Sequence, residues 1–390
     1  MRIVIAVLAG AAALAACVSA RPVASTASIA SHVADAQRLA GQDLKALLTL
    51  CEPVPPKVAA QDAIDRLVSQ QIARPAPEPG QAFDNLYYVG AAWVSAWALK
   101  TSDGVILIDA LNNGKEAAGV LEPAMRKVGL NPEDIRYVLV THAHGDHYGG
   151  AQYLVQQHRT RVAMSDVDWA VARVKPEVDS ASWDRMPQVD TVLKQGEALV
   201  LGDTRVTAQI TPGHTVGTLS PVFEVKHRGR THKVLLWGGT AFNFGKDFGR
   251  LDSYIAATER MAALAQRDNI DVLLSNHPGY DGTVAKLAAL RGNPGGADNP
   301  FVMGTPNVVR ALQVMAPAPR RSAIALRSSP AALRAVRRRC AMTITRTATT
   351  STVNRITANS AADRTMTNST ADDRQRNEAA RPSRSAGSLN

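Results

Sequence analysis

Five histidines and one aspartate in this chain have the residue types and the spacing of ligands for two metal ions. Four of them stand within the seven residues 141–147, namely His142, His144, Asp146 and His147. The other two, His214 and His277, each follow a strand-like run in a turn that contains proline and glycine. Imidazole and carboxylate are usual zinc ligands in sites that keep one position open for water. Six such ligands supply three per metal, so the pattern predicts hydrolysis at a pair of zinc ions.

The spacing within residues 141–147 indicates how these ligands divide between the two metals. His142 and His144 are two positions apart just after a strand, so an extended backbone points both rings toward the same metal. Asp146 and His147 are adjacent, so their side chains diverge and reach a second metal. Gly145 is expected to ease a tight turn between the two pairs. Each pair then needs one further ligand from a distant part of the chain.

Residues 83–315 contain the elements that must position these ligands. Strands are expected at 86–89, 93–99, 105–109, 137–141, 161–164, 205–210, 219–225, 233–237 and 272–275. Helices are expected at 116–128, 151–157, 166–173 (with Ser165 as N-cap), 251–267, 283–291 and 305–315. Turn dipeptides at 103–104 and 228–229 mark hairpins. Hairpins mixed with helical crossovers predict an α/β fold, an αββα sandwich of two mixed β-sheets with helices on the outer faces.

The rest of the chain divides into three further parts. Residues 1–20 have the composition of an export signal, and residues 21–82 predict a helical arm with helices at 34–48 and 60–71 between proline clusters. From residue 316 onward the chain is rich in Ala, Arg, Ser and Thr, and no aromatic residue follows Phe301. Residues 316–390 are therefore expected to be disordered. The alternative is that this stretch is an out-of-frame reading of the gene.

The net charge of +10 belongs to that C-terminal tail. Residues 317–390 contain fourteen Arg, no Lys and four acidic residues, whereas residues 1–316 hold 30 basic and 30 acidic residues. Arg-rich segments can bind nucleic acid, but this one lacks interleaved aromatic residues. We therefore expect a small-molecule substrate as the partner, no nucleic acid, and a monomeric protein.

The N-terminal segment predicts the compartment. Arg2 precedes an apolar stretch that ends in small residues and is short for a membrane-spanning helix. Cleavage after Ala20 would release a periplasmic protein. Residues 14–17 also resemble a bacterial lipobox, and lipidation of Cys17 would instead anchor the chain to the outer membrane. Both routes remain open, and membrane contact is expected only for the second.

The ligand pattern resembles the metallo-β-lactamase superfamily, whose hallmark is His-x-His-x-Asp-His at the end of a strand. The resemblance covers about residues 83–315 and is greatest to the third subclass of class B β-lactamases, which use no Cys ligand. It implies two Zn²⁺ ions, the first held by His142, His144 and His214 and the second by Asp146, His147 and His277. Residues 237–240 lack the Cys or bridging Asp of other branches, which argues against the glyoxalase, lactonase and phosphodiesterase branches.

The same resemblance implies a reaction. A hydroxide bound by the two zinc ions would open the amide of a β-lactam antibiotic, with Asp146 as the catalytic residue that orients it. The loop 174–187, which carries Trp183, is expected to form one wall of the site. Phe242 stands where such β-lactamases offer a hydroxyl, so another ester, lactone or amide is the alternative substrate. The expected substrate contacts are Thr240, Asn243 and Tyr148.

Overall fold

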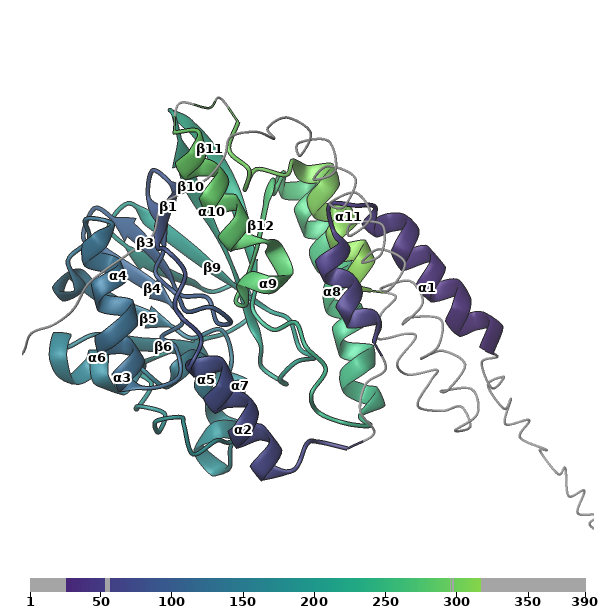
Figure 1. Cartoon of the computed structure of the whole chain (residues 1–390), viewed down its shortest axis with the longest axis horizontal. Coiled ribbons are helices and arrows are strands. Elements are labelled where there is room, and N and C mark those ends of the chain that lie inside the picture. The colour runs from purple at the N-terminus through teal and green to yellow at the C-terminus, as the bar shows by residue number, and fades with distance from the viewer. Residues whose placement is uncertain (1–25, 53–56, 295, 297, 317–390) are drawn as a thin grey trace, which may run out of the picture. The chain divides into compact units, whose positions relative to one another are not determined.

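Two β-sheets pack between two layers of helices in the computed structural model, which describes residues 26–52, 57–294, 296 and 298–316 (Figure 1). Within these residues, one sheet contains in spatial order β1 (Gly80–Phe83), β2 (Leu86–Tyr88), β3 (Trp97–Thr101), β4 (Gly104–Ile108), β5 (Ile135–Leu139), β6 (Arg161–Ser165) and β7 (Thr191–Leu193). The other contains, in spatial order, β12 (Val272–Ser275), β11 (Arg230–Trp237), β10 (Leu219–His227), β9 (Thr204–Ile210) and β8 (Ala198–Leu201). All described residues lie in one of the two units into which the chain divides.

Strand direction brings distant loops to the same edges of the sheets. Strands β4 to β7 pair in parallel, so the loop after β5 leaves the first sheet at its carboxyl edge. In the second sheet β9 and β11 are both antiparallel to β10, and β12 is parallel to β11. Strands β9, β11 and β12 therefore run in one direction, and the segments that follow them emerge together.

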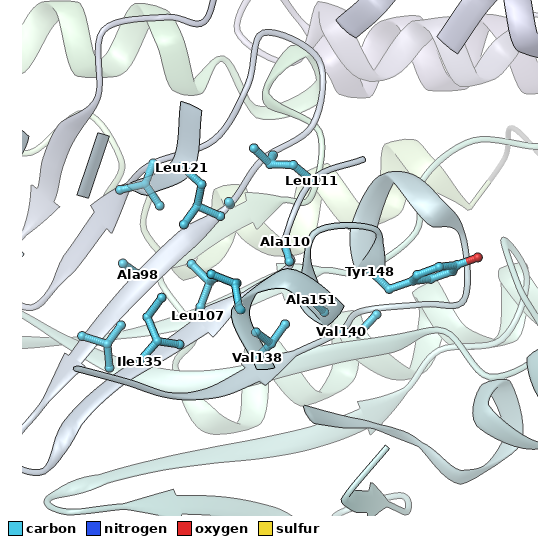
Figure 2. Packing of buried hydrophobic residues seen from close by; sticks show 14 of the residues in the cluster. Ala98, Leu107, Ala110, Leu111, Leu121, Ile135, Val138, Val140, Tyr148 and Ala151 are labelled. Atoms are coloured by element: carbon cyan, nitrogen blue, oxygen red, sulfur yellow. The ribbon is translucent and has the colours of Figure 1, made fainter. Parts of the chain in front are cut away.

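The core has three layers of buried side chains. Strand β4 shows why, because its side chains alternate between the two faces of the first sheet. Ile106 and Ile108 pack between the sheets with Phe223 of β10. Val105 and Leu107 pack under the helices on the outer face, in the cluster drawn in Figure 2. Burial on both faces explains the continuous apolar sequence of this strand.

Helices cover both outer faces, on opposite sides of the sheets in Figure 1. The first sheet is covered by α3 (Gly114–Glu116), η2 (Ala117–Leu121), α4 (Glu122–Lys127) and α6 (Ala151–His158). The second is covered by α8 (Phe248–Asp268), α11 (Thr305–Met315), α1 (Thr26–Ala40) and η1 (Lys45–Cys51). The remaining helices are α2 (Gln61–Ile72), η3 (Pro132–Asp134), α5 (Gly145–Tyr148), α7 (Asp166–Val174), α9 (Pro278–Asp281) and α10 (Thr283–Gly292). None of the helices in the described ranges has the length and apolar character needed to cross a membrane.

The αββα architecture predicted from the sequence is confirmed, while several boundaries differ. The strand expected at 93–99 begins only at Trp97, because residues 91–94 form a turn closed by a hydrogen bond from the Ala91 N–H to the Val94 carbonyl. The helix expected at 116–128 is interrupted by a π-helical turn just before Pro123, whose ring cannot donate within a regular helix. Strands β1, β7 and β8 were not predicted, and the first sheet begins before residue 83. The predictions for residues 1–20 and 317–390 lie outside the described residues.

Candidate metal centre

The six predicted ligands lie in the segments that follow three strands, at the facing edges of the two sheets. His142 and His144 follow β5, and Asp146 and His147 stand in the short helix α5 that comes next. The second sheet supplies the other two, because His214 follows β9 and His277 follows β12. Each sheet therefore contributes to the same cluster.

Three imidazole rings converge in a first group. The Nε2 atoms of His142 and His214 lie 3.0 Å apart, and each lies 3.1 Å from Nδ1 of His144. Nδ1 of His142 donates to the Gly238 carbonyl at 2.8 Å, and Nδ1 of His214 donates to the Ala241 carbonyl at 2.6 Å. Since a carbonyl can only accept, both rings carry their proton on Nδ1. Their Nε2 lone pairs therefore point toward each other.

The first group is electrically neutral around neutral pH. Burial, together with the neighbouring histidines, holds the pKa of His142 and His214 well below the usual range. Burial also lowers the pKa of His144 to about 4. Nε2 of His144 is buried without a hydrogen-bond partner among the described residues. Three lone pairs without a proton between them need a cation, which is the arrangement of a metal site.

The distances of the first group fit zinc. Zinc–nitrogen bonds of about 2.0–2.1 Å in a tetrahedral site separate two ligand nitrogens by roughly 3.3 Å. The nitrogens of His142, His144 and His214 are 3.0–3.1 Å apart, and all three rings are buried. The grouping of ligand atoms indicates that this site binds metal.

A second group lies beside the first. Nε2 of His147 is 3.3 Å from a carboxylate oxygen of Asp146, and Nε2 of His277 is 3.8 Å from the same oxygen. His142 lies close enough to Asp146 and His147 to form a compact trio with them. Nδ1 of His277 donates to the Trp93 carbonyl at 2.5 Å, so its Nε2 is also free to bind a metal. The structure thus brings together all six residues that the sequence predicted.

The second group is charged, unlike the first. Burial opposes a charge on His147, but Asp146 and Asp109 outweigh this effect and raise its pKa to about 10. Burial likewise opposes ionisation of Asp146, and the neighbouring His147 outweighs it and lowers the pKa of the carboxyl. Without metal the two side chains therefore form a buried ion pair, and a metal must displace the proton of His147.

Two buried carboxylates hold the ligand loops, and no sequence pattern predicted their role. Asp109 accepts from Nδ1 of His147 at 2.8 Å and from the N–H and hydroxyl of Thr141 at 2.8 and 2.9 Å. Asp168 joins the loop of the first sheet to that of the second. It accepts from the Ala143 N–H at 2.9 Å and from the Gly217 N–H at 2.6 Å.

An arginine and an asparagine complete the support. Arg250, near the start of α8, donates to the backbone carbonyls of Gly213 and His214. Its guanidinium also pairs with Glu177 at 2.8 Å, which ties the His214 loop to the loop 175–187. The side-chain amide of Asn276 donates to the Gly238 carbonyl at 2.7 Å, next to Nδ1 of His142. These contacts fix the rings before any metal binds.

Gly145 is required for packing and not for the turn that was predicted. Its φ is not positive, so the backbone conformation alone does not demand glycine. A Cβ at this position would lie 2.4 Å from ring carbons of Trp183. The indole of Trp183 therefore packs directly on the backbone between the two pairs of ligands.

A cavity of about 470 Å³ opens over the ligands. His144, Asp146, His214 and His277 line it. Trp183 and Val178 form part of its wall, as predicted for the loop 174–187, and Asn243 lines it as well. A pocket of this size can hold a drug-sized ligand.

Two of the three predicted substrate contacts do not line this cavity. Thr240 is buried and lines a separate cavity of about 500 Å³, with its hydroxyl 3.4 Å from that of Ser275. Tyr148 stands at one edge of the cluster in Figure 2, with its hydroxyl pointing away from the other labelled residues. Burial raises the pKa of Tyr148 to about 12. Thr240 follows β11, and a position just after a strand identifies the edge of the sheet but not the direction of the side chain. Tyr148 instead ends the short helix α5.

Comparisons with known proteins agree with this geometry. Residues 92–228 match the family model described as the metallo-beta-lactamase superfamily. The structure is similar to that of BJP-1, a subclass B3 metallo-β-lactamase of Bradyrhizobium japonicum, with a TM-score of 0.54 and 31% identity over 62% of this chain and 92% of that one. The chain belongs to the metallo-β-lactamase superfamily and has its fold.

Two curated relatives have other activities. A hydroxyacylglutathione hydrolase of Rhodopseudomonas palustris is 34% identical over 130 residues, which are 33% of this chain and 42% of that protein. The acyl-coenzyme A thioesterase MBLAC2 of Gallus gallus is 24% identical over 216 residues, 49% of this chain and 74% of that protein. The chain thus matches less than half of the first relative, which comes from a branch that residues 237–240 argued against.

Proposed function

We propose that this protein is an exported hydrolase that opens the amide of β-lactam antibiotics with two zinc ions. The observation that carries the proposal is the convergence of three neutral imidazoles beside the group of Asp146, His147 and His277. The similarity to the β-lactamase BJP-1 along most of that protein supports the choice of substrate.

Each group would hold one ion, the first on His142, His144 and His214 and the second on Asp146, His147 and His277. Zinc in such a site supplies a water of lowered pKa and polarises the carbonyl under attack. Asp146 remains ionised and lines the cavity, so its carboxylate can accept a hydrogen bond from a water and orient it. Trp93 and Asp109 hold the rings of His277 and His147 through their Nδ1 protons. Asn243 is the predicted substrate contact that lines the cavity.

A thioester is the second candidate substrate. Two observations favour it: the curated relatives are a hydroxyacylglutathione hydrolase and an acyl-coenzyme A thioesterase, and the hydroxyl of Thr240 does not line the cavity. Because the Thr240 hydroxyl is not part of the cavity, it cannot make the predicted contact with the carboxylate of a β-lactam.

Metal analysis paired with a substrate panel tests the proposal. We expect about two zinc ions per chain and turnover of nitrocefin and a carbapenem. The panel includes an acylglutathione and an acyl-coenzyme A. Zinc-loaded protein that cleaves only the thioesters replaces the first candidate with the second. Protein that binds no zinc, or that cleaves nothing in the panel, refutes the hydrolytic function.

Export is part of the same proposal and concerns residues outside the described part of the chain. The mass of the protein recovered from cells distinguishes its two routes. Cleavage after Ala20 yields a soluble periplasmic chain, whereas lipidation yields a membrane-bound chain that begins at Cys17 and carries acyl groups. Full-length chain in the cytoplasm would contradict both.

A further inference from the structure

The apolar face of helix α2 has no protein core behind it. Ile64, Leu67 and Val68 have the three- and four-residue spacing that places side chains on one face of a helix. Such a face normally packs on the core. In α2 only Val68 is buried, and Leu67 is 53% exposed. All three side chains line the cavity over the candidate metal centre.

Polar contacts to a loop hold the helix at this cavity. The side-chain amide of Gln61 donates to the Asp179 carbonyl at 2.8 Å. The N–H of Ala181 donates to the carboxylate of Asp65 at 2.9 Å. Both partners belong to the loop 175–187, which itself lines the cavity. The helix is therefore held by its polar side chains while its apolar face stays open to the cavity.

The apolar wall continues to the ligands. Trp93, Trp183 and Tyr280 line the same cavity, together with Val58, which is 46% exposed. The ring centroid of Trp93 lies 5.7 Å from that of His277. Single exposed apolar residues are common on protein surfaces. Here several exposed apolar side chains line one cavity that reaches the metal ligands. A molecule that covers these side chains therefore also contacts the ligands.

We propose that the face of α2 formed by Ile64, Leu67 and Val68 is the subsite for a large apolar group of the substrate. The inference rests on the proposed hydrolytic function and narrows its substrate class. The protein acts on carboxylic acid derivatives with an aromatic or long aliphatic acyl group, whose carbonyl lies at the histidine cluster while the apolar part covers α2. Derivatives with a small acyl group leave this face exposed and bind weakly.

Binding of carboxylate products tests the subsite without catalysis. Calorimetric titration of the zinc-loaded full chain compares acetate with octanoate, which share a head group and differ in the apolar chain. Each fully buried methylene changes affinity by about fourfold. Partial cover by α2 should therefore make octanoate bind at least roughly thirtyfold more tightly than acetate. Equal affinities would overturn the inference.

Two matched variants locate the effect. Leu67→Ser should weaken octanoate binding about five- to tenfold and leave acetate binding unchanged. Val200→Ser on β8 is the control, because Val200 is equally exposed, at 54%, but does not line this cavity. Octanoate affinity that is the same in both variants would also overturn the inference. Failure of the substrate panel would refute the proposed function and leave the comparison of octanoate with acetate unaffected. Equal affinities for octanoate and acetate would refute the subsite and leave the result of the substrate panel unaffected.

Discussion

The two ligand groups should respond differently to acid when zinc binds. Histidine binds a metal only as neutral imidazole. Although burial opposes its charge, Asp146 and Asp109 raise the pKa of His147 to about 10, so the metal-free protein carries a proton there throughout the neutral range. Burial holds the pKa of His144 at about 4, and its group has no proton to displace.

The difference has a predictable size. One proton must leave the second group for each ion bound, so its apparent zinc affinity should fall about tenfold between about pH 6.5 and about pH 5.5. This change equals about 1.4 kcal/mol of binding free energy. The affinity of the first group should stay constant over the same window. The window lies below the value near 7 at which zinc-bound water ionises, so that water does not contribute.

Stepwise zinc titration of the metal-free protein against a chelator measures both affinities. Calorimetry in two buffers with different ionisation enthalpies counts the protons released. We expect none for the first equivalent and about one for the second near pH 6. His147→Ala should abolish the pH-dependent event and keep the pH-independent one. Equal pH slopes for the two equivalents, or a second equivalent that releases no proton, would refute the reasoning.

Three further changes test the supporting structure. Gly145→Ala places a Cβ against the Trp183 ring and should lower the free energy of unfolding by about 1–3 kcal/mol; a denaturant double-mutant cycle with Trp183→Ala should show a smaller loss in that background. Asp168→Ala leaves buried donors of both ligand loops unpaired, so it should lower the free energy of unfolding by roughly 2–4 kcal/mol. An unchanged midpoint of denaturant unfolding would contradict the role of Asp168 in holding these loops. Burial acts to raise the pKa of Glu122, but hydrogen bonds from His158 and Arg126 outweigh it and lower the pKa below 4.5. The stabilisation from Glu122 is then complete above about pH 4.5 and is lost as the pH falls through the folded pKa. Denaturant unfolding should therefore show that the stability difference between the native chain and Glu122→Gln shrinks as the pH is lowered through this range.

The ligands could be predicted from the sequence because their signal is local. Four of them stand within seven residues, and His214 and His277 follow strands that β-propensity identifies. The sheets were predictable for the same reason, since β4 and β12 are unbroken apolar runs. Strand β7 has only three residues and no such pattern, so pairing with β6 defines it. Strand β8 is a four-residue apolar run, Ala198–Leu201, that could have been predicted in the same way and was not.

The supporting residues could not be predicted because their roles depend on tertiary contacts. Ser165 was correctly predicted as the cap of α7, and its hydroxyl accepts from the Asp168 N–H. The carboxylate of Asp168 instead reaches across to the loops after β5 and β9. Arg250 likewise gives no signal in sequence, because its carbonyl partners lie 36 and 37 positions away.

The division of the six ligands between the two sheets also has a cellular consequence. A metal ion held by His142 from one sheet and His214 from the other would crosslink the two sheets at their facing edges. A ligand that binds only the folded state raises stability in proportion to the logarithm of its concentration. Chelation should therefore lower the melting temperature of the whole molecule and speed its digestion by proteases. If the protein is exported as proposed, the amount of folded chain that survives would then follow the supply of zinc in that compartment.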